Sequence, residues 1–383
     1  MSVTIKDIAR EAGVSYASVS RALSGSRGVS VKTAQRILAV AKKLNYLPNG
    51  IARNLVNQRS KTLGLILPDI SNPFFSDIAL AVIHTAERAG YQTILSNTDW
   101  EPRAQERQLQ LMREQRVDGI ILKPVQDTVD GAAYENLGLP AVLLHYSGSK
   151  VVSCVDTDHD YGGYLMTRHL LDCGCRRIAF LGGLPDSRSN LQRLEGYTRA
   201  LLEDGLAPDD RLVRHGPFTS ESGYALAKEL LTHSEAGEPP DALFCGNDVI
   251  ALGALQYAQE TGIRVPQELC IAGFDGISYA SLAQIRLTTI RQDRQRMGET
   301  ATHLLLDEIE SNSEPAVQKV LLTPTLLAQA TTGTCGWTRP DKNTKNRKEK
   351  KGMVLHNGRT AEISPDNGSA SLCSEPRHNW LRL

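Results

Sequence analysis

The sequence predicts an α/β protein in which a helical headpiece, residues 1–47, precedes a core of two doubly wound parallel-sheet subdomains. Two short amphipathic stretches separated by a glycine open the chain. From Lys61 short apolar runs alternate with amphipathic helical patterns, and the alternation starts again at the run RRIAFLGG. Strands that alternate with helices form parallel sheets wrapped by helices, so two such series predict two similar subdomains with a cleft between them. At 383 residues the chain is also too long for one ordinary core.

The first helix is expected at residues 4–11. Thr4 followed by Asp7 matches a capping box, in which side chains and backbone satisfy each other at the helix start. One face is apolar because four residues recur at the spacing i, i+3, i+4 and i+7: Ile5, Ile8, Ala9 and Ala12. Gly13 then supplies the permissive backbone that a tight turn needs.

A second short helix follows the turn, with Ser15 suited to its N-cap. It is expected to pack through Val19, Ala22 and Leu23 and to expose Tyr16, Ala17, Ser20 and Arg21. Two helices joined in this way insert the first residues of the second helix into the major groove of DNA. Arg21 is suited to a guanine edge or a phosphate, and Tyr16 and Ala17 to base edges or a thymine methyl. The alternative is a small helical bundle without a ligand.

Charge is distributed unevenly along a chain whose formal net charge is zero. Residues 1–60 contain ten Lys or Arg and two Asp or Glu, whereas residues 61–336 contain 23 basic and 36 acidic side chains. A basic excess of this size on a small module is the electrostatic signature of phosphate binding. The headpiece, and not the acidic core, is therefore the part suited to nucleic acid.

A third helix is expected after Ser30, and it closes the headpiece core through Ala34, Ile37, Leu38, Ala41 and Leu44. Residues 48–60 then form a linker in which Asn49 can cap a helix of about two turns. So short a helix is marginal in water, and Gly50 weakens it further, so we expect it to order only when something packs on it. A flexible linker is the alternative.

The core pattern consists of eight expected strands and the helices between them. The strands are TLGLILP, YQTILS, DGIILK, PAVLLH, RRIAFLGG, DRLVRHG, DALFCG and LCIAGFD. The helices are expected at residues 74–89, 103–115, 193–203, 220–231 and 248–261. In open sheets of this kind, ligands bind at the carboxyl ends of the strands.

Eight candidate ligand-binding residues lie near those ends: Asp69, Phe74, Phe75, Trp100, Arg193, Phe218, Asn247 and Asp275. Aromatic faces suit apolar ring surfaces, a guanidinium and an amide donate hydrogen bonds, and carboxylates accept them from hydroxyls. Their shared position predicts a site for a polar, ring-shaped solute. Each residue also has a structural alternative, since Phe74 and Phe75 would fill a core and Asp275 would cap a turn.

No enzyme or cofactor motif is complete. The run DTDHD resembles the start of a calcium loop, but Tyr161 and Thr167 stand where that loop needs Gly and Glu. The patterns GxGxxG, GxxxxGK[ST], HExxH and GxSxG are absent. His145, near the end of an apolar run, is either a ligand contact or a structural histidine. We therefore expect no catalysis, no cofactor and no metal.

Cysteine usage and hydropathy bear on the compartment. The seven cysteines lie mostly in apolar runs and show neither CxxC nor zinc-ligand spacing. No apolar segment is long enough to cross a bilayer. These features predict reduced thiols in a cytoplasmic protein without a membrane partner.

Taken together, the chain resembles the LacI/GalR family of bacterial transcription regulators over about residues 3–334. The resemblance rests on TIKDIAREAGVS with VSRAL, NYLPNGIARNL, GLILPDISNPFF, VDGIIL, RRIAFLGG, QRLEGY, CGNDVIALGAL and IAGFD. It implies a helix-turn-helix headpiece, a hinge helix and a periplasmic-binding-protein-like core over residues 61–335. The N-subdomain would comprise about 61–160 and 292–322, and the C-subdomain about 161–291 and 323–335.

The resemblance also implies double-stranded operator DNA as a partner and a place at the bacterial nucleoid. Family members are dimers or tetramers on near-palindromic operators, and the missing C-terminal leucine heptad favours a homodimer here. Leu55, supported by Ala52, would wedge into the minor groove and kink the duplex. The expected DNA-binding residues are Thr4, Ser15, Tyr16, Ala17, Ser20, Arg21, Asn49, Ala52 and Leu55.

The implied second partner is a small effector, a sugar or sugar derivative, held in the cleft by the residues at the strand ends. Trp100 stands where the family more often has an acidic residue, which makes it the candidate for stacking on a sugar ring. The implied function is a repressor whose operator affinity the effector sets allosterically.

Two other functions compete with this one. A sugar-binding protein without regulatory DNA binding would share the two-lobed core, but the basic headpiece argues against it. A sugar-converting enzyme would need an acid/base pair or a metal set that the motifs do not supply. Residues 336–383 are basic and poor in apolar side chains, so we expect them to be disordered, and a passive extension is favoured over a DNA-binding arm.

Overall fold

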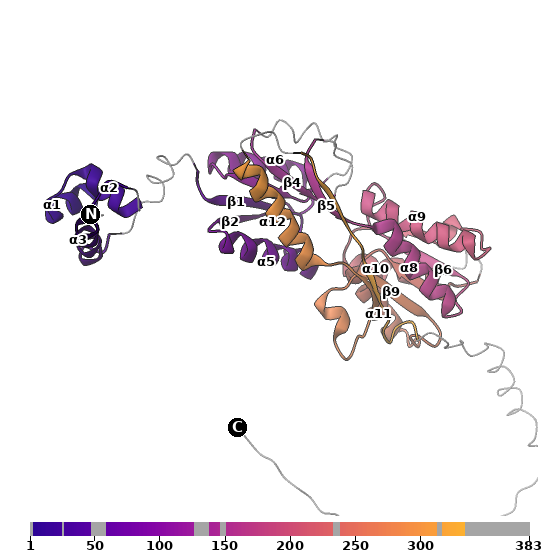
Figure 1. Ribbon diagram of the computed structural model, residues 1–383. Helices are drawn as coiled ribbons and strands as arrows, with labels where there is room; N and C mark the ends of the chain where they lie inside the picture. The colour runs from indigo at the N-terminus through magenta and orange to yellow at the C-terminus, as the bar shows by residue number, and fades with distance from the viewer. Residues whose placement is uncertain are drawn as a thin grey trace, which may run out of the picture. The chain divides into compact units, whose positions relative to one another are not determined.

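The computed structural model describes residues 3–24, 27–46, 59–125, 138–145, 151–232, 238–311 and 316–333 (Figure 1). The predictions for the hinge helix, with Asn49, Ala52 and Leu55, lie outside the described residues. The prediction for the tail, residues 336–383, lies outside them as well.

Three helices form the headpiece, as the sequence predicts: α1 (Ile5–Ala12), α2 (Tyr16–Ser24) and α3 (Val31–Lys43). Their shared core contains Ile8, Ala12, Val19, Ile37 and Ala41. The expectation that Leu38 belongs to this core is wrong, because 50 % of its surface is exposed. Val40 packs against the core instead, since it lies three residues after Ile37 on the same helical face.

The first core unit, called the N-subdomain below, is built on a parallel six-stranded sheet. Its strands, in spatial order, are β11 (Lys319–Leu322), β5 (Ser153–Thr157), β4 (Ala141–Leu144), β3 (Gly119–Leu122), β1 (Thr62–Leu67) and β2 (Gln92–Asn97). Successive residues of β1 join different cores: Leu65 packs with α5 (Pro73–Arg88) and α12 (Arg294–Glu310), and Ile66 with α6 (Pro102–Glu114). Helices therefore cover both faces, as a parallel sheet requires.

The second unit, the C-subdomain, repeats this architecture. Its strands, in spatial order, are β12 (Thr325–Leu327), β10 (Thr288–Arg291), β9 (Cys270–Asp275), β8 (Ala242–Cys245), β6 (Ile178–Gly182) and β7 (Val213–His215), with only β12 antiparallel to its neighbour. The helices α8 (His159–Asp172) and α9 (Arg188–Glu203) pack in one core, and α10 (Ser220–Thr232) and α11 (Asp248–Glu260) in another. Short 3-10 turns lie at η1 (Asp210–Leu212) and η3 (Ser278–Ser281).

Three chain segments connect the two subdomains, after β5, after β10 and after β11. Strand β5 does not follow from the apolar pattern of the sequence, because three of its residues are polar although all five are buried. The sequence pattern also predicts the start of α9 at residue 193, whereas the helix begins at Arg188. Arg193 therefore projects from within α9 and not from a strand end.

Candidate functional site

The start of α1 is held by contacts between Thr4 and Asp7. The backbone N–H and the hydroxyl of Thr4 both donate to Asp7 Oδ2, at 3.0 and 2.7 Å. These hydrogen bonds hold the pKa of the Asp7 carboxyl below its usual value. Thr4 thus acts at the helix start, and its expected contact with DNA stays a prediction.

The second headpiece helix presents a polar face to solvent. Gly13 ends α1 with a φ of 63°, and Ser15 Oγ accepts the Ser18 N–H at 3.2 Å where α2 begins. Val19 is completely buried, which anchors the opposite side of α2. The expected DNA-contacting side chains of this segment are exposed or half-buried: Ser15, Tyr16, Ala17, Ser20 and Arg21.

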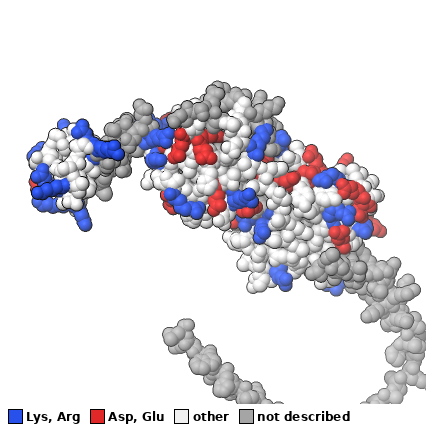
Figure 2. All heavy atoms as spheres, viewed as in Figure 1, with Lys and Arg blue, Asp and Glu red and all other residues white. Residues whose placement is uncertain are grey.

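The headpiece surface is strongly basic, as Figure 2 shows for the face in view. Every Lys and Arg in its described residues is exposed: Lys6, Arg10, Arg21, Arg27, Lys32, Arg36, Lys42 and Lys43. One of its two carboxylates, Glu11, lies 3.0 Å from Lys43 Nζ and connects α1 to α3. Such a surface attracts phosphate groups in a salt-dependent way.

The core contains a pocket between the two subdomains. The residues lining it are Asn72, Phe74, Phe75, Trp100, Lys123, His145, Ser187, Ser189, Arg193, Phe218, Asn247 and Asp275. Seven of the eight side chains that the sequence places at strand ends are thus brought together, while Asp69 is not among them.

Asp69 closes a turn and does not line this pocket. Its Oδ1 accepts the backbone N–H of Ser71 at 2.9 Å and the Ser71 hydroxyl at 2.6 Å. Asn72 lines the pocket in its place and caps α5 by accepting the Phe74 N–H at 3.0 Å. The reason is local, because an Asp two residues before a serine satisfies its carboxylate within its own loop.

Aromatic rings run across the pocket from one subdomain to the other. Phe74 and Phe75 meet edge to face with centroids 5.1 Å apart, and Phe75 lies 5.9 Å from Trp100. Trp100, in the N-subdomain, stacks on Phe218 of the C-subdomain at 6.0 Å. These faces give the pocket the flat apolar surfaces that a ring-shaped ligand can stack on.

Arg193 and Asp275 form the charged part of the pocket. Arg193 lies over the Phe274 ring, 3.8 Å from its centroid, and donates to the carbonyl of Gly246. Its guanidinium is 3.9 Å from Asp275 Oδ1, which also accepts the side-chain N–H of Gln292 at 2.7 Å. Burial raises the pKa of Asp275 to about 6, although the nearby Arg193 charge acts to lower it. Burial likewise lowers the pKa of Arg193.

Asn247 combines two positions that the sequence suggests, a strand end and a helix start. It lies two residues after the end of β8, and its Oδ1 accepts the Ile250 N–H at 2.8 Å to cap α11. Two further lining residues, Lys123 and His145, directly follow β3 and β4. From the sequence, His145 is either a ligand contact or a structural histidine, outside the expected set of eight. Lys123 is not among the predicted residues, although the strand-end rule could have found it.

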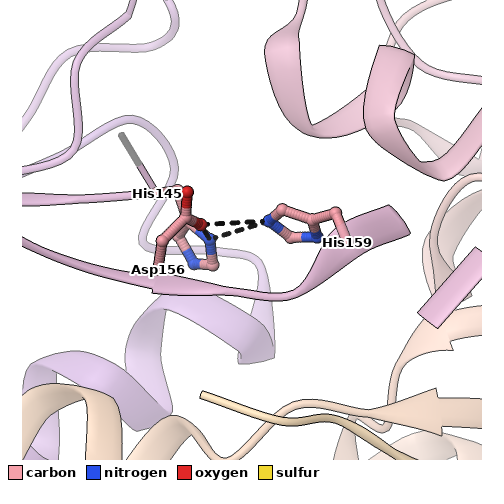
Figure 3. Close-up of side chains that lie close together, drawn as sticks. All are labelled: His145, Asp156 and His159. Atoms are coloured by element: carbon pink, nitrogen blue, oxygen red, sulfur yellow. Dashed lines mark hydrogen bonds and ion pairs between the residues drawn. The ribbon is translucent and has the colours of Figure 1, made fainter. Parts of the chain in front are cut away.

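His145 also belongs to a buried cluster with Asp156 and His159 (Figure 3). Asp156 Oδ1 is 3.4 Å from His145 Nδ1 and 3.3 Å from His159 Nε2. His159 Nδ1 in turn accepts from the Arg193 guanidinium at 3.3 Å. The cluster therefore connects the end of β4 in one subdomain to α9 in the other.

Two general features concern thiols and membranes. The described cysteines are all buried: Cys154, Cys173, Cys175, Cys245 and Cys270. In the described part of the chain, no helix combines the length and apolar character that a bilayer span requires.

Two protein-family models match the chain. Residues 4–49 match the model for bacterial regulatory proteins of the lacI family. Residues 167–332 match the model for a periplasmic binding protein-like domain. The two matches cover the headpiece helices and most of the C-subdomain.

Whole-chain relatives agree with these matches. The HTH-type transcriptional repressor PurR of Haemophilus influenzae is 34 % identical over 330 residues, which is 85 % of this chain and 97 % of that protein. The ribose operon repressor of Halalkalibacterium halodurans is also 34 % identical over 330 residues, 86 % of this chain and 97 % of that protein.

Among solved structures, the lac repressor dimer bound to operator and the anti-inducer ONPF is 29 % identical and has a TM-score of 0.78. That match covers 87 % of this chain and all of the other. A transcriptional regulator CelR–cellobiose complex is 30 % identical over 86 % of this chain and 99 % of the other, with a TM-score of 0.65. These relatives are regulators and not enzymes, which confirms the non-enzymatic prediction and disfavours a binding protein without a DNA-binding function.

The three-helix headpiece lies within the lacI-family match, and most of the C-subdomain lies within the periplasmic binding protein-like match. With 34 % identity over 330 residues to a repressor that it spans almost completely, the chain belongs to the lacI family of bacterial regulatory proteins and is a DNA-binding transcriptional repressor.

Proposed function

We propose that this repressor binds a near-palindromic operator as a homodimer in the bacterial cytoplasm, at the nucleoid, and that a sugar or sugar derivative sets its operator affinity. The observation that carries the effector assignment is the pocket, which both subdomains line with aromatic rings and hydrogen-bonding side chains. A ribose operon repressor and a cellobiose-bound regulator among the relatives support a sugar as the ligand class.

In this proposal the headpiece reads the major groove through Tyr16, Ala17 and Arg21, which α2 exposes. Leu55, supported by Ala52, is the expected wedge in the minor groove. A lac repressor solved as a dimer on its operator supports this division of roles.

The effector site holds the ligand between Trp100 and Phe74 of one subdomain and Arg193 and Asp275 of the other. Because it contacts both halves, the ligand favours one arrangement of the subdomains over another. Arg294, at the start of α12, already connects them, since its guanidinium contacts Asp77 Oδ2 at 2.9 Å and the Asp275 carbonyl at 2.6 Å. An operator that prefers one arrangement is coupled to the effector, and the coupling is reciprocal.

The test is selection of operators from random duplex DNA by the purified full-length chain, repeated at several salt concentrations and with a panel of sugars and sugar acids. We expect a palindromic site, a steep loss of affinity with salt, and one compound that releases or tightens the complex. Weak binding without a preferred sequence would contradict the operator assignment. Strong operator binding that no panel compound alters would contradict the effector assignment.

A further inference from the structure

One pocket side chain has a hydrogen-bonding atom without a partner. His145 is 5 % exposed and lines the pocket, and its Nε2 has no hydrogen-bond partner among the described residues. The other ring nitrogen, Nδ1, is 3.4 Å from Asp156 Oδ1. A buried imidazole nitrogen on a side chain that lines a ligand site is either a donor or an acceptor, and the neighbours of the ring decide which.

Arg193 determines the tautomer of His159, because a guanidinium can only donate hydrogen bonds. Its guanidinium nitrogens Nε and Nη2 both lie 3.3 Å from His159 Nδ1, so that nitrogen must be the acceptor. Burial, and then the Arg193 charge, lower the pKa of His159 to about 4, so the ring is neutral. The single proton of His159 is therefore on Nε2, 3.3 Å from Asp156 Oδ1.

The ionisation state of Asp156 in turn determines which ring nitrogen of His145 carries a proton. Although burial acts to raise the pKa of Asp156, hydrogen bonds from His145 and His159 hold it well below its usual range, so the carboxylate is ionised and can only accept. His145 Nδ1 lies 3.3 Å from His159 Nε2 and 3.4 Å from Asp156 Oδ1. The carboxylate favours a proton on His145 Nδ1 over an Nδ1 that accepts from His159, because an Nδ1 lone pair would face that of the carboxylate oxygen. Burial lowers the pKa of His145, and the charges of Lys123 and Arg193 act in the same direction, so His145 is neutral too.

The same three atoms are also close enough together to act as ligands of one metal ion. The distances among His145 Nδ1, His159 Nε2 and Asp156 Oδ1 are 3.3 to 3.4 Å. Ligands at about 2.0–2.1 Å from a tetrahedral Zn²⁺ would be spaced in about that way. A metal on Nε2 of neutral His159 would, however, move its proton to Nδ1, where it would face the Arg193 donors. The arginine therefore favours the hydrogen-bonded cluster over the metal.

We propose that Arg193, His159 and Asp156 act as positioning residues that fix His145 Nε2 as a hydrogen-bond acceptor, so that the effector must present an O–H or N–H donor to it. This specificity rests on the proposed function of the pocket. A ligand without the facing donor leaves a buried acceptor unpaired, and we expect it to bind about 10- to 100-fold more weakly.

The decisive measurement needs no effector. In full-length protein labelled with ¹⁵N-histidine, two-bond ¹⁵N–¹H correlation spectra at pH 7 report the tautomer of each ring, and the His145→Gln variant identifies the His145 signals. We expect His145 in the Nδ1–H form and His159 in the Nε2–H form. An Nε2–H form or a charged imidazolium for His145 would overturn the proposal, and so would a Zn²⁺ titration that binds stoichiometrically and moves both rings.

Two matched variants test whether Asp156 sets the tautomer of His145. In Asp156→Asn the amide can both donate and accept, so His145 is expected to populate the other tautomer. In Asp158→Asn, two residues away, the side chain only caps α8 through the Tyr161 N–H, and an asparagine serves that role equally well, so no tautomer should change. An unchanged His145 tautomer in Asp156→Asn would contradict the proposal that Asp156 fixes the proton on His145 Nδ1.

The same spectra test the ligand requirement with D-ribose, cellobiose and D-gluconate as probes. Any probe that binds is expected to shift His145 Nε2 while Nδ1 keeps its proton, and at least one of its deoxy analogues should bind 10- to 100-fold more weakly. Binding that leaves Nε2 unmoved, or equal affinity for all deoxy analogues, would contradict the requirement. If no probe binds, the effector proposal is weakened. The spectra without effector still test whether His145 Nε2 is an acceptor.

Discussion

Trp100 of the N-subdomain lies almost flat against Phe218 of the C-subdomain, with ring centroids 6.0 Å apart and ring planes 28° apart. Trp100 reaches this position from a tight turn, since Asp99 and Trp100 have φ values of 52° and 59°. Side-chain-bearing residues rarely adopt that conformation, and it persists where the surrounding structure holds it. The turn between β2 and α6 therefore holds the indole in the pocket at some cost in backbone strain.

Replacing Trp100 by alanine is expected to weaken effector binding about 5- to 30-fold, because a stacking face worth about 1–2 kcal/mol is lost. Operator affinity without effector should stay the same, since Trp100 is no part of the headpiece. Titration calorimetry and operator-binding assays measure the two quantities. Trp100→Phe is the control, because it keeps an aromatic face and should lose less. An unchanged titration for Trp100→Ala would rule out the stacking role.

The pKa of Asp275 predicts a pH-dependent term in stability. Burial raises this pKa to about 6, compared with about 3.9 in an unfolded chain. The folded protein thus binds the proton more tightly, so the contribution of Asp275 to stability is fully present below about pH 4 and is lost as the pH rises through about 6.

Between about pH 5 and pH 7.5 we therefore expect the free energy of unfolding of the wild type to fall by about 1 kcal/mol relative to Asp275→Asn, which has no such group. Urea unfolding of both proteins at the two pH values measures the difference. A difference that is independent of pH, or that grows with pH, would show that Asp275 ionises normally.

Close packing of α8 on α9 predicts the effect of a single methyl group. A Cβ at Gly163 would lie 2.2 Å from the carbonyl oxygen of Arg193. Gly163→Ala is therefore expected to destabilise the fold by about 1–3 kcal/mol and to weaken effector binding by moving Arg193. Thermal unfolding and effector titration test both effects.

Gly174→Ala is the matched control for this substitution. Gly174 has a φ of 84° and no atom within 4 Å of the added Cβ, so alanine there strains only the local backbone. Its stability should fall by about 1–2 kcal/mol with effector binding intact. Intact effector binding in Gly163→Ala would mean that Arg193 tolerates the displacement.

If α2 reads the major groove as proposed, a change on its exposed face is expected to reduce sequence preference without altering the salt dependence of binding. Tyr16 is 55 % exposed in the first turn of α2. Tyr16→Ala should reduce discrimination at one base pair of each half-site by about 1–3 kcal/mol, while the salt slope is unchanged because no charge is removed. Competition binding with operator variants measures this. Val31→Ala, at a 76 % exposed position of α3, is the control. Equal base preference in the wild type and Tyr16→Ala would show that Tyr16 does not contribute to base recognition.

Much of the fold follows from local pattern. The expected strand at 62–68 and helix at 74–89 correspond to β1 and α5, displaced by a single residue at most ends. The carboxyl ends of parallel strands share one edge of a sheet, so strand-end position predicted that Phe74, Asn247 and Asp275 would meet. Asp69 fails the same rule because its own loop satisfies its carboxylate.

Strand β5 shows where local pattern stops being informative. Asp156 and Thr157 are buried in it, and a polar residue in an apolar run reads as a loop unless its partners are known. Those partners, His145 and His159, lie just after β4 and at the start of α8. No sequence pattern indicates that these side chains meet Asp156.

The sequence by itself determined the two-subdomain α/β architecture, the basic headpiece and the kinds of side chain available at the strand ends, because period, propensity and charge are local properties. Only the tertiary structure decided which polar groups meet. His145 lies beside Asp156 because β4 pairs with β5 in a register that sets Leu144 opposite Val155. Arg193 completes the cluster because α9 packs from the other subdomain. Register and packing arise from long-range contacts, which no window of sequence contains.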